Sequence, residues 1–180
     1  FNLKKTDKVV EALEEKLRKT PNDAAALDEL TAIYTMTGRF KAASDLINPR
    51  LAANPKNPDL LQARMVISDK TKNMSQLIQD AQTLLGLNVL SEEEEWDTKT
   101  TLAAAFQANH QNIEAFKLYE EILNHDRSDP DNWLNVVFVL ESMGRYHDVV
   151  SLLEDYLAKF PLDQDRQKMS KSKGNVIDPL

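Results

Sequence analysis

Apolar residues recur three and four positions apart along most of this chain, which is the spacing of helices that bury one face. The stretches with this spacing are residues 7–19, 22–36, 40–53, 58–70, 73–86, 92–108, 112–124, 130–143 and 147–160. Between them stand short segments with turn residues such as Gly and Pro. The pattern therefore predicts an all-α protein built from short helices.

A longer period groups these helices into pairs. The interval from Gly38 to Pro55 equals the interval from Gly144 to Pro161, and it is half the interval from Pro21 to Pro55. Each glycine is followed by an aromatic residue two places on and a small or β-branched residue five places on. A fixed period of about 34 residues is typical of stacked helical hairpins. We expect a right-handed α-solenoid of antiparallel hairpins, with about four and a half repeats.

Two departures interrupt the period. Lys72 stands where a glycine is expected one period after Gly38, so the geometry of this second hairpin is open to question. The pattern then resumes four residues late, at His110, which places an insertion between Gly86 and Glu95. Inside that insertion Ser91 and the glutamate three residues later form the pattern of a helix capping box.

The positions that repeat resemble the tetratricopeptide repeat family over residues 7–161. The matching residues are Leu27, Leu30, Tyr34, Gly38, Phe40, Ala43 and Pro55, then Leu102, Ala103, Phe106, Ala115 and Tyr119, and finally Trp133, Gly144, Tyr146 and Pro161. Ile47 continues the predicted core of the first full hairpin. The resemblance implies one repeat domain over residues 1–161 that holds other proteins and carries out no chemistry.

In that family the first helix of each hairpin lines a concave groove. Phasing the four first helices gives an inward set with acidic, neutral and small apolar side chains. The set is Asp28, Glu29, Ala32, Thr35, Asp59, Gln62, Val66, Asp69, Asp97, Thr100, Thr101, Ala104, Gln107, Asp131, Leu134, Asn135, Phe138 and Glu141. These positions are not basic, so the carboxylate clamp of heat-shock co-chaperones does not fit. We expect an adaptor, of an assembly or chaperone type, for an extended, neutral-to-basic peptide.

Two alternatives to this groove stay open. Charged helical faces are commonly just solvated, so the acids could serve solubility alone. The chain could also be a structural spacer within a larger repeat protein.

Composition narrows the function classes. The formal net charge of −7 argues against nucleic-acid binding, which needs a basic surface. No apolar run reaches the roughly 18 residues of a membrane span. There is no cysteine, which excludes disulfides and thiolate metal sites but does not fix the compartment. The chain opens at Phe1 within the repeat pattern, and we interpret it as a fragment whose targeting information could have been lost.

The segment after Pro161 leaves the period. Residues 168–180, KMSKSKGNVIDPL, resemble the signature loop of class I aminoacyl-tRNA synthetases, in particular the bacterial valyl enzyme. The resemblance would give Lys168 and Lys171 a role on ATP phosphates. That role needs a nucleotide-binding domain and a His-x-Gly-His motif, and the chain has neither. We therefore interpret residues 162–180 as a tail outside the repeats, of fused or artefactual origin. The alternative is a genuine strand that occupies the groove of a neighbouring copy.

Other candidate sites are weak. His110, His125 and His147 fall at different helical phases, without acidic partners at metal-ligand spacing. The run Glu92–Glu95 points around a helix and cannot converge on one ion. No phosphate loop, nucleophile elbow or zinc motif occurs. We therefore expect no catalytic residues, no metal and no cofactor.

Overall fold

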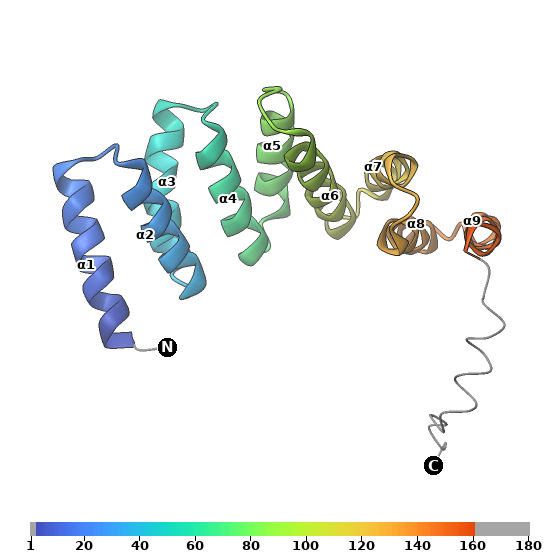
Figure 1. Ribbon diagram of the computed structural model, residues 1–180, viewed down its shortest axis with the longest axis horizontal. Helices are drawn as coiled ribbons and strands as arrows, with labels where there is room; N and C mark the ends of the chain where they lie inside the picture. Colours follow the sequence, from blue (N-terminus) through green and yellow to red (C-terminus); the bar gives the residue numbers. More distant parts are fainter. Residues whose placement is uncertain (1–2, 161–180) are drawn as a thin grey trace, which may run out of the picture. The chain divides into compact units, whose positions relative to one another are not determined.

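The structure is a computed structural model that describes residues 3–160, with side chains from Thr6 onward; over that range it contains α-helices and no strand (Figure 1). The helices are α1 (Leu3–Lys19), α2 (Ala24–Met36), α3 (Phe40–Ala53), α4 (Pro58–Lys70), α5 (Met74–Leu85), α6 (Glu92–Ala108), α7 (Asn112–His125), α8 (Pro130–Ser142) and α9 (Tyr146–Lys159). Each matches a stretch with helical spacing in the sequence. The largest difference is at the start of α1, which begins four residues before the expected Asp7.

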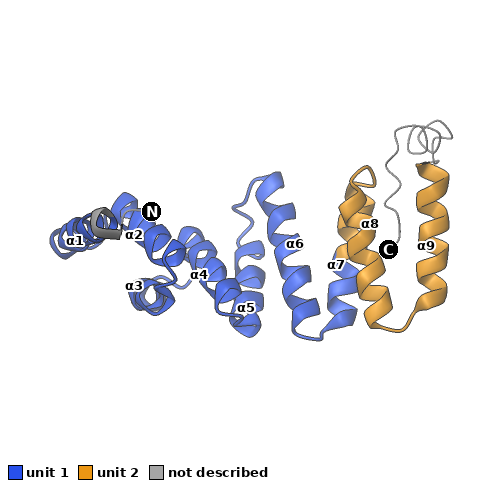
Figure 2. Cartoon of the chain, turned by 90° about the horizontal axis from the view of Figure 1, so that it is seen from below, with its two compact units in different colours: residues 1–118 blue, residues 119–180 orange. Residues whose placement is uncertain are grey.

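The chain divides into two compact units (Figure 2). The first spans residues 1–118 and holds α1 to α6 with the beginning of α7; in it, each helix from α1 to α6 packs against the next. The second spans residues 119–180 and includes the packed pair α8 and α9. The two units are described separately, so one repeat domain over residues 1–161 stays a prediction.

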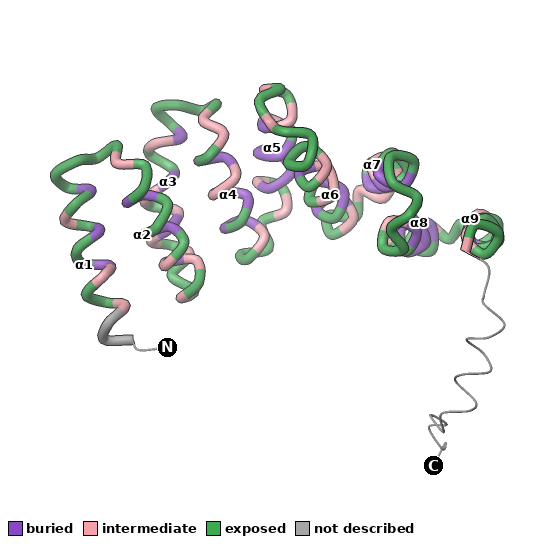
Figure 3. Tube along the Cα trace, in the orientation of Figure 1, coloured by how far each residue is buried: buried purple, intermediate pink, exposed green. Residues whose placement is uncertain are grey.

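The core contains most of the residues that the period placed there, although Phe40 is only half-buried. Leu27, Leu30 and Tyr34 of α2 are buried, as are Ala43 and Ile47 of α3. Figure 3 shows buried positions recurring on each helix from α1 to α6, with exposed positions between them. Helices of 12 to 17 residues are marginal alone in water, so this shared burial is what holds them folded.

The four positions that end the first helices share one backbone conformation. Gly38 and Gly144 have φ of 71° and 69°, and Lys72 and His110 both have φ of 58°, all in the left-handed region. After each of them, a backbone N–H bonds the carbonyl five residues back, as in Arg39 to Tyr34 at 2.7 Å and Asn73 to Ser68 at 2.8 Å. This is the Schellman arrangement that closes a helix end. The second hairpin is therefore regular in geometry, although it lacks the glycine.

The insertion falls where the sequence placed it. The connection between α5 and α6 leads into a helix of 17 residues, whereas α2, α4 and α8 have 13 each. Ser91 caps α6: its hydroxyl accepts the Glu94 backbone N–H, and the Glu94 carboxylate accepts the Ser91 N–H at 2.8 Å. The Ser91 N–H and the Ser91 hydroxyl both donate to the Glu94 carboxylate and lower the pKa of Glu94. Much of the insertion is thus one extra, acidic first turn, which suits the positive end of a helix dipole.

The left-handed turn at His110 gives a stability prediction. An L-residue in this conformation costs roughly 1–2 kcal/mol, and glycine avoids that cost but loses more entropy on folding. We expect His110→Gly to raise the free energy of unfolding by about 0.5–1 kcal/mol in a denaturant titration. Asn109→Gly is the control, because Asn109 has φ of −93° and needs no glycine. A destabilised His110→Gly variant would contradict the strain assigned to this turn.

Trp133 gives a second prediction, in the second unit. Its ring is buried, packs edge-on against Tyr156 at 5.5 Å, and its indole N–H donates to the Arg127 carbonyl at 3.0 Å. We expect Trp133→Ala to lower the free energy of unfolding by about 3–5 kcal/mol, because it leaves a cavity and an unpaired carbonyl. Trp133→Phe keeps most of the ring and should lose less. An unchanged denaturation midpoint for Trp133→Ala would show that the ring contributes no packing energy.

Candidate functional site

The predicted groove residues all lie on first helices, α2, α4, α6 and α8, and none of them is buried. The opposite faces of these helices carry buried residues such as Leu30, Leu61 and Val136, so the predicted set is left facing solvent. Whether that set binds a peptide stays a prediction. The structure does show which of its members come together.

A pocket of about 860 Å³ lies among α4, α5 and α6 in the first unit. Gln62, Val66 and Asp69 of α4 and Thr100 and Thr101 of α6 line it, all five of them predicted, together with Ala104. The rest of the lining is Met65, Lys70, Lys72, Met74, Leu77, Ala105 and Ala108. This volume falls in the range of ligand-binding clefts.

The pocket has an apolar floor and small side chains on one wall. Met65, Leu77 and Ala105 are buried at its base, while Val66 is half exposed at its edge. Ala104 and Ala108 on α6 leave space because their side chains are only methyl groups. Gln62 and Thr101 bring an amide and a hydroxyl that can bond a peptide backbone. The arrangement suits one apolar side chain of an extended segment, with polar groups beside it for the backbone.

The net charge of the pocket lining differs from the acidic character that we predicted from the first-helix residues. Lys70 and Lys72 also line it, each with its ammonium 3.4 Å from a carboxylate oxygen of Asp69. Two lysines against one aspartate leave this lining with one net positive charge. Sequence reasoning missed both lysines because it counted only inward positions within the first helices. Lys70 ends α4 and Lys72 forms the following turn.

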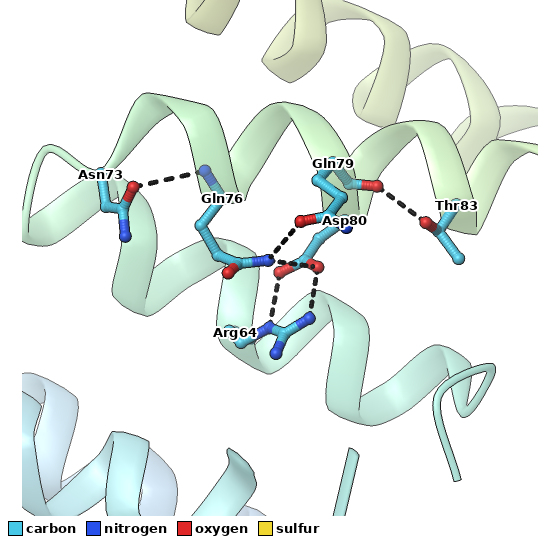
Figure 4. Close-up of polar contacts among 6 residues, drawn as sticks. All are labelled: Arg64, Asn73, Gln76, Gln79, Asp80 and Thr83. Carbon is cyan, nitrogen blue, oxygen red and sulfur yellow. Dashed lines mark hydrogen bonds and ion pairs between the residues drawn. The ribbon is translucent and has the colours of Figure 1, made fainter. Parts of the chain in front are cut away.

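A buried ion pair fixes the two helices behind the pocket (Figure 4). Arg64 of α4 donates from Nε and Nη2 to the two carboxylate oxygens of Asp80 in α5, at 2.8 and 2.6 Å. Gln76 donates to the same carboxylate at 3.1 Å. Asp80 is only 1% exposed, so these donors take the place of the water that its carboxylate would otherwise bond. Arg64 precedes Met65 and Gln76 precedes Leu77, so these contacts are next in sequence to two residues of the pocket floor.

The remaining predicted residues are not brought into this pocket. Asp28, Glu29 and Thr35 lie on α2, while Asp59, Asp97 and Gln107 lie on α4 and α6 outside the lining. The residues on α8 belong to the second unit. There Leu134 and Phe138 are exposed one turn apart, with Asn135 and Glu141 on the same helix.

A second pocket, of about 640 Å³, lies among α1, α2 and α3 and contains no predicted site residue. Its polar side chains mostly have partners within the protein. Tyr34 donates to Glu14, and burial, then this bond, raises the pKa of Tyr34 to about 12. Arg50 donates to the backbone carbonyls of Leu46 and Pro21 at 2.6 and 2.9 Å, although its Nε has no hydrogen-bond partner. It offers a ligand fewer free polar groups than the first pocket.

Other kinds of site find little support in the part of the chain that the structure describes. Over those residues, no group of three or more His, Asp or Glu side chains could hold a metal ion. None of the described helices combines the length and apolar character that a bilayer crossing requires. The KMSKS-like segment, with Lys168 and Lys171, lies outside the described residues.

No protein-family model matches the sequence, and no curated protein matches it either. Solved structures do match. A crystal structure of MamA protein has a TM-score of 0.70 at 15% identity, covering 98% of this chain and 90% of that one. MamA 41-end from Desulfovibrio magneticus RS-1 has a TM-score of 0.70 at 11% identity, with 85% and 84% covered. A tetratricopeptide repeat protein from Parabacteroides merdae ATCC 43184 has a TM-score of 0.68 at 19% identity, with 86% and 60% covered.

The buried ion pair behind the pocket gives a third prediction. Asp80→Ala leaves the Arg64 guanidinium beside α5 without its carboxylate partner. Removing one partner of a buried pair costs about 3 kcal/mol in the free energy of unfolding. The matched control is Asp45→Ala, which removes an exposed Lys41–Asp45 pair of the same 2.6 Å length and should cost under about 1 kcal/mol. Equal losses in the two variants would contradict a special role for Asp80. Arg64→Met with Asp80→Leu should recover most of the stability, since no unpaired charge remains.

The similarity of this chain to these solved structures confirms the predicted fold class, an all-α, tetratricopeptide-like solenoid of helical hairpins.

Proposed function

We propose that this chain is a protein–protein interaction scaffold that holds an extended peptide segment in the pocket among α4, α5 and α6. The observation that carries the proposal is that five residues predicted from phasing alone line a single pocket with an apolar floor. Stacked hairpin folds present extended surfaces of this kind to other proteins. No catalytic group is part of the proposal.

The pocket suggests how the segment is held. An apolar side chain of the peptide enters over Met65 and Leu77, where the flexible thioether can adapt to its shape. The amide of Gln62 and the hydroxyl of Thr101 bond the peptide backbone. Affinity then comes from burial, while flanking charges set which segments are attracted.

The expected preference for neutral-to-basic peptides rests on acidic side chains outside the pocket. Asp59 and Asp97 are exposed on α4 and α6, whereas Lys70 and Lys72 work against a basic residue at the pocket itself. We therefore place any basic residues of the peptide several positions away from its apolar anchor.

Filling the pocket tests the proposal. Twelve-residue peptides would be selected from a random display library on the wild-type chain and their dissociation constants measured by fluorescence anisotropy. Ala104→Trp places a large ring in the pocket and should weaken binding at least tenfold, about 1.4 kcal/mol. Ala12→Trp makes the same exchange at an exposed position on α1 and should leave binding unchanged.

Two outcomes would count against this function, and a third would count against the expected peptide preference alone. Selected peptides whose affinity is insensitive to Ala104→Trp bind elsewhere. Selection that yields no binder above background favours the spacer alternative. A selection rich in acidic residues, weakened by added salt, would overturn the neutral-to-basic preference and leave the pocket itself supported.

A further inference from the structure

Helix α9 is apolar on two sides, but α8 covers only one of them. Val149 is buried, and Leu152 and Tyr156 are half-buried. The other side carries Val150, Leu153 and Leu157, which are 55%, 41% and 47% exposed. Their spacing of three and four residues places them along one stripe of the helix. We call these three residues the α9 stripe.

The internal period identifies what covers this stripe elsewhere in the chain. Leu153 and Leu157 follow Gly144 at the same two intervals at which Ile47 and Leu51 follow Gly38. Ile47 and Leu51 are 0% and 3% exposed, and α3, which carries them, packs against α4 as well as α2. Tyr119 and Leu123 stand at the same two positions after His110 and are 4% and 3% exposed.

In the first unit, the helix that follows α3 and packs against it is α4. The buried side chains of α4 include Leu60, Leu61 and Met65. A helix that packs against the α9 stripe needs apolar residues on its facing side over about one and a half turns.

The segment that follows α9, where the period places the next first helix, does not have the apolar pattern of α4. One period after α8 the sequence reaches residues 164–176, which contain two apolar side chains, Met169 and Val176. An amphipathic helix needs three or four apolar residues in two turns. By composition, this segment does not match the stripe.

We propose that the α9 stripe is a docking surface for an amphipathic helix of another polypeptide, with apolar residues spaced as in α4. The proposal is independent of the peptide pocket, which lies in the first unit. Glu154, exposed one turn after Val150, borders the stripe and favours a partner with a basic residue at that edge.

A peptide copied from the chain tests this docking surface. The probe is a fluorescein-labelled peptide of residues 54–73, which contains α4 and its flanks, titrated with the whole chain and followed by anisotropy. Leu153→Glu with Leu157→Glu should weaken binding at least tenfold. Ile113→Glu is the matched control, because it makes the same kind of exchange at an apolar residue that is 59% exposed on α7, outside the stripe and the peptide pocket.

A second variant separates a direct loss of binding from a loss of folding. Val150→Lys alters the most exposed residue of the stripe and should weaken binding without changing the thermal midpoint by circular dichroism. Absence of binding to the wild-type chain, or equal binding to the stripe variants, would overturn the proposal. Self-association that ultracentrifugation shows to be abolished by Leu153→Glu, without peptide binding, would assign the stripe to a second copy and would also overturn it.

Discussion

The structure depends on one constraint: its helices are too short to be stable alone, so each must bury its apolar face against the next helix. In the first unit this neighbour-to-neighbour packing runs without interruption from α1 to α6. Side chains that face neither neighbour are free to meet solvent or a ligand. The pocket among α4, α5 and α6 is a direct product of that arrangement, since its floor is core and its walls are exposed first-helix residues.

Much of the fold could be predicted from the sequence, because the same pattern of apolar and turn residues recurs in successive repeats. The helices at 40–53, 58–70 and 92–108 have the bounds that the sequence predicted, the last two as approximate ranges. The positions of Gly38 and Gly144 gave the turns. Position 72 was harder, because a lysine rarely adopts a left-handed backbone and the sequence alone does not show that its neighbours hold it there.

The candidate site was less predictable, for a physical reason. Phasing identifies which side of one helix is exposed, so Gln62, Val66 and Thr101 could be found. It does not show how the end of one helix and the following turn reach the same space, which is why Lys70 and Lys72 were missed. The Arg64–Asp80 pair was also missed, since the two positions are far apart in the sequence and meet only when α4 and α5 pack.

Lys72 combines a left-handed backbone conformation with a charged side chain in the pocket lining. A glycine there would relieve the turn, as it does at positions 38 and 144, but it would bring no side chain to the cleft. The lysine retains a less favourable torsion and adds a cation to the pocket lining. Strained positions of this kind are often found where a protein meets its ligand. The repeat whose sequence departs most from the pattern is thus the one whose turn adds a cation to the pocket lining.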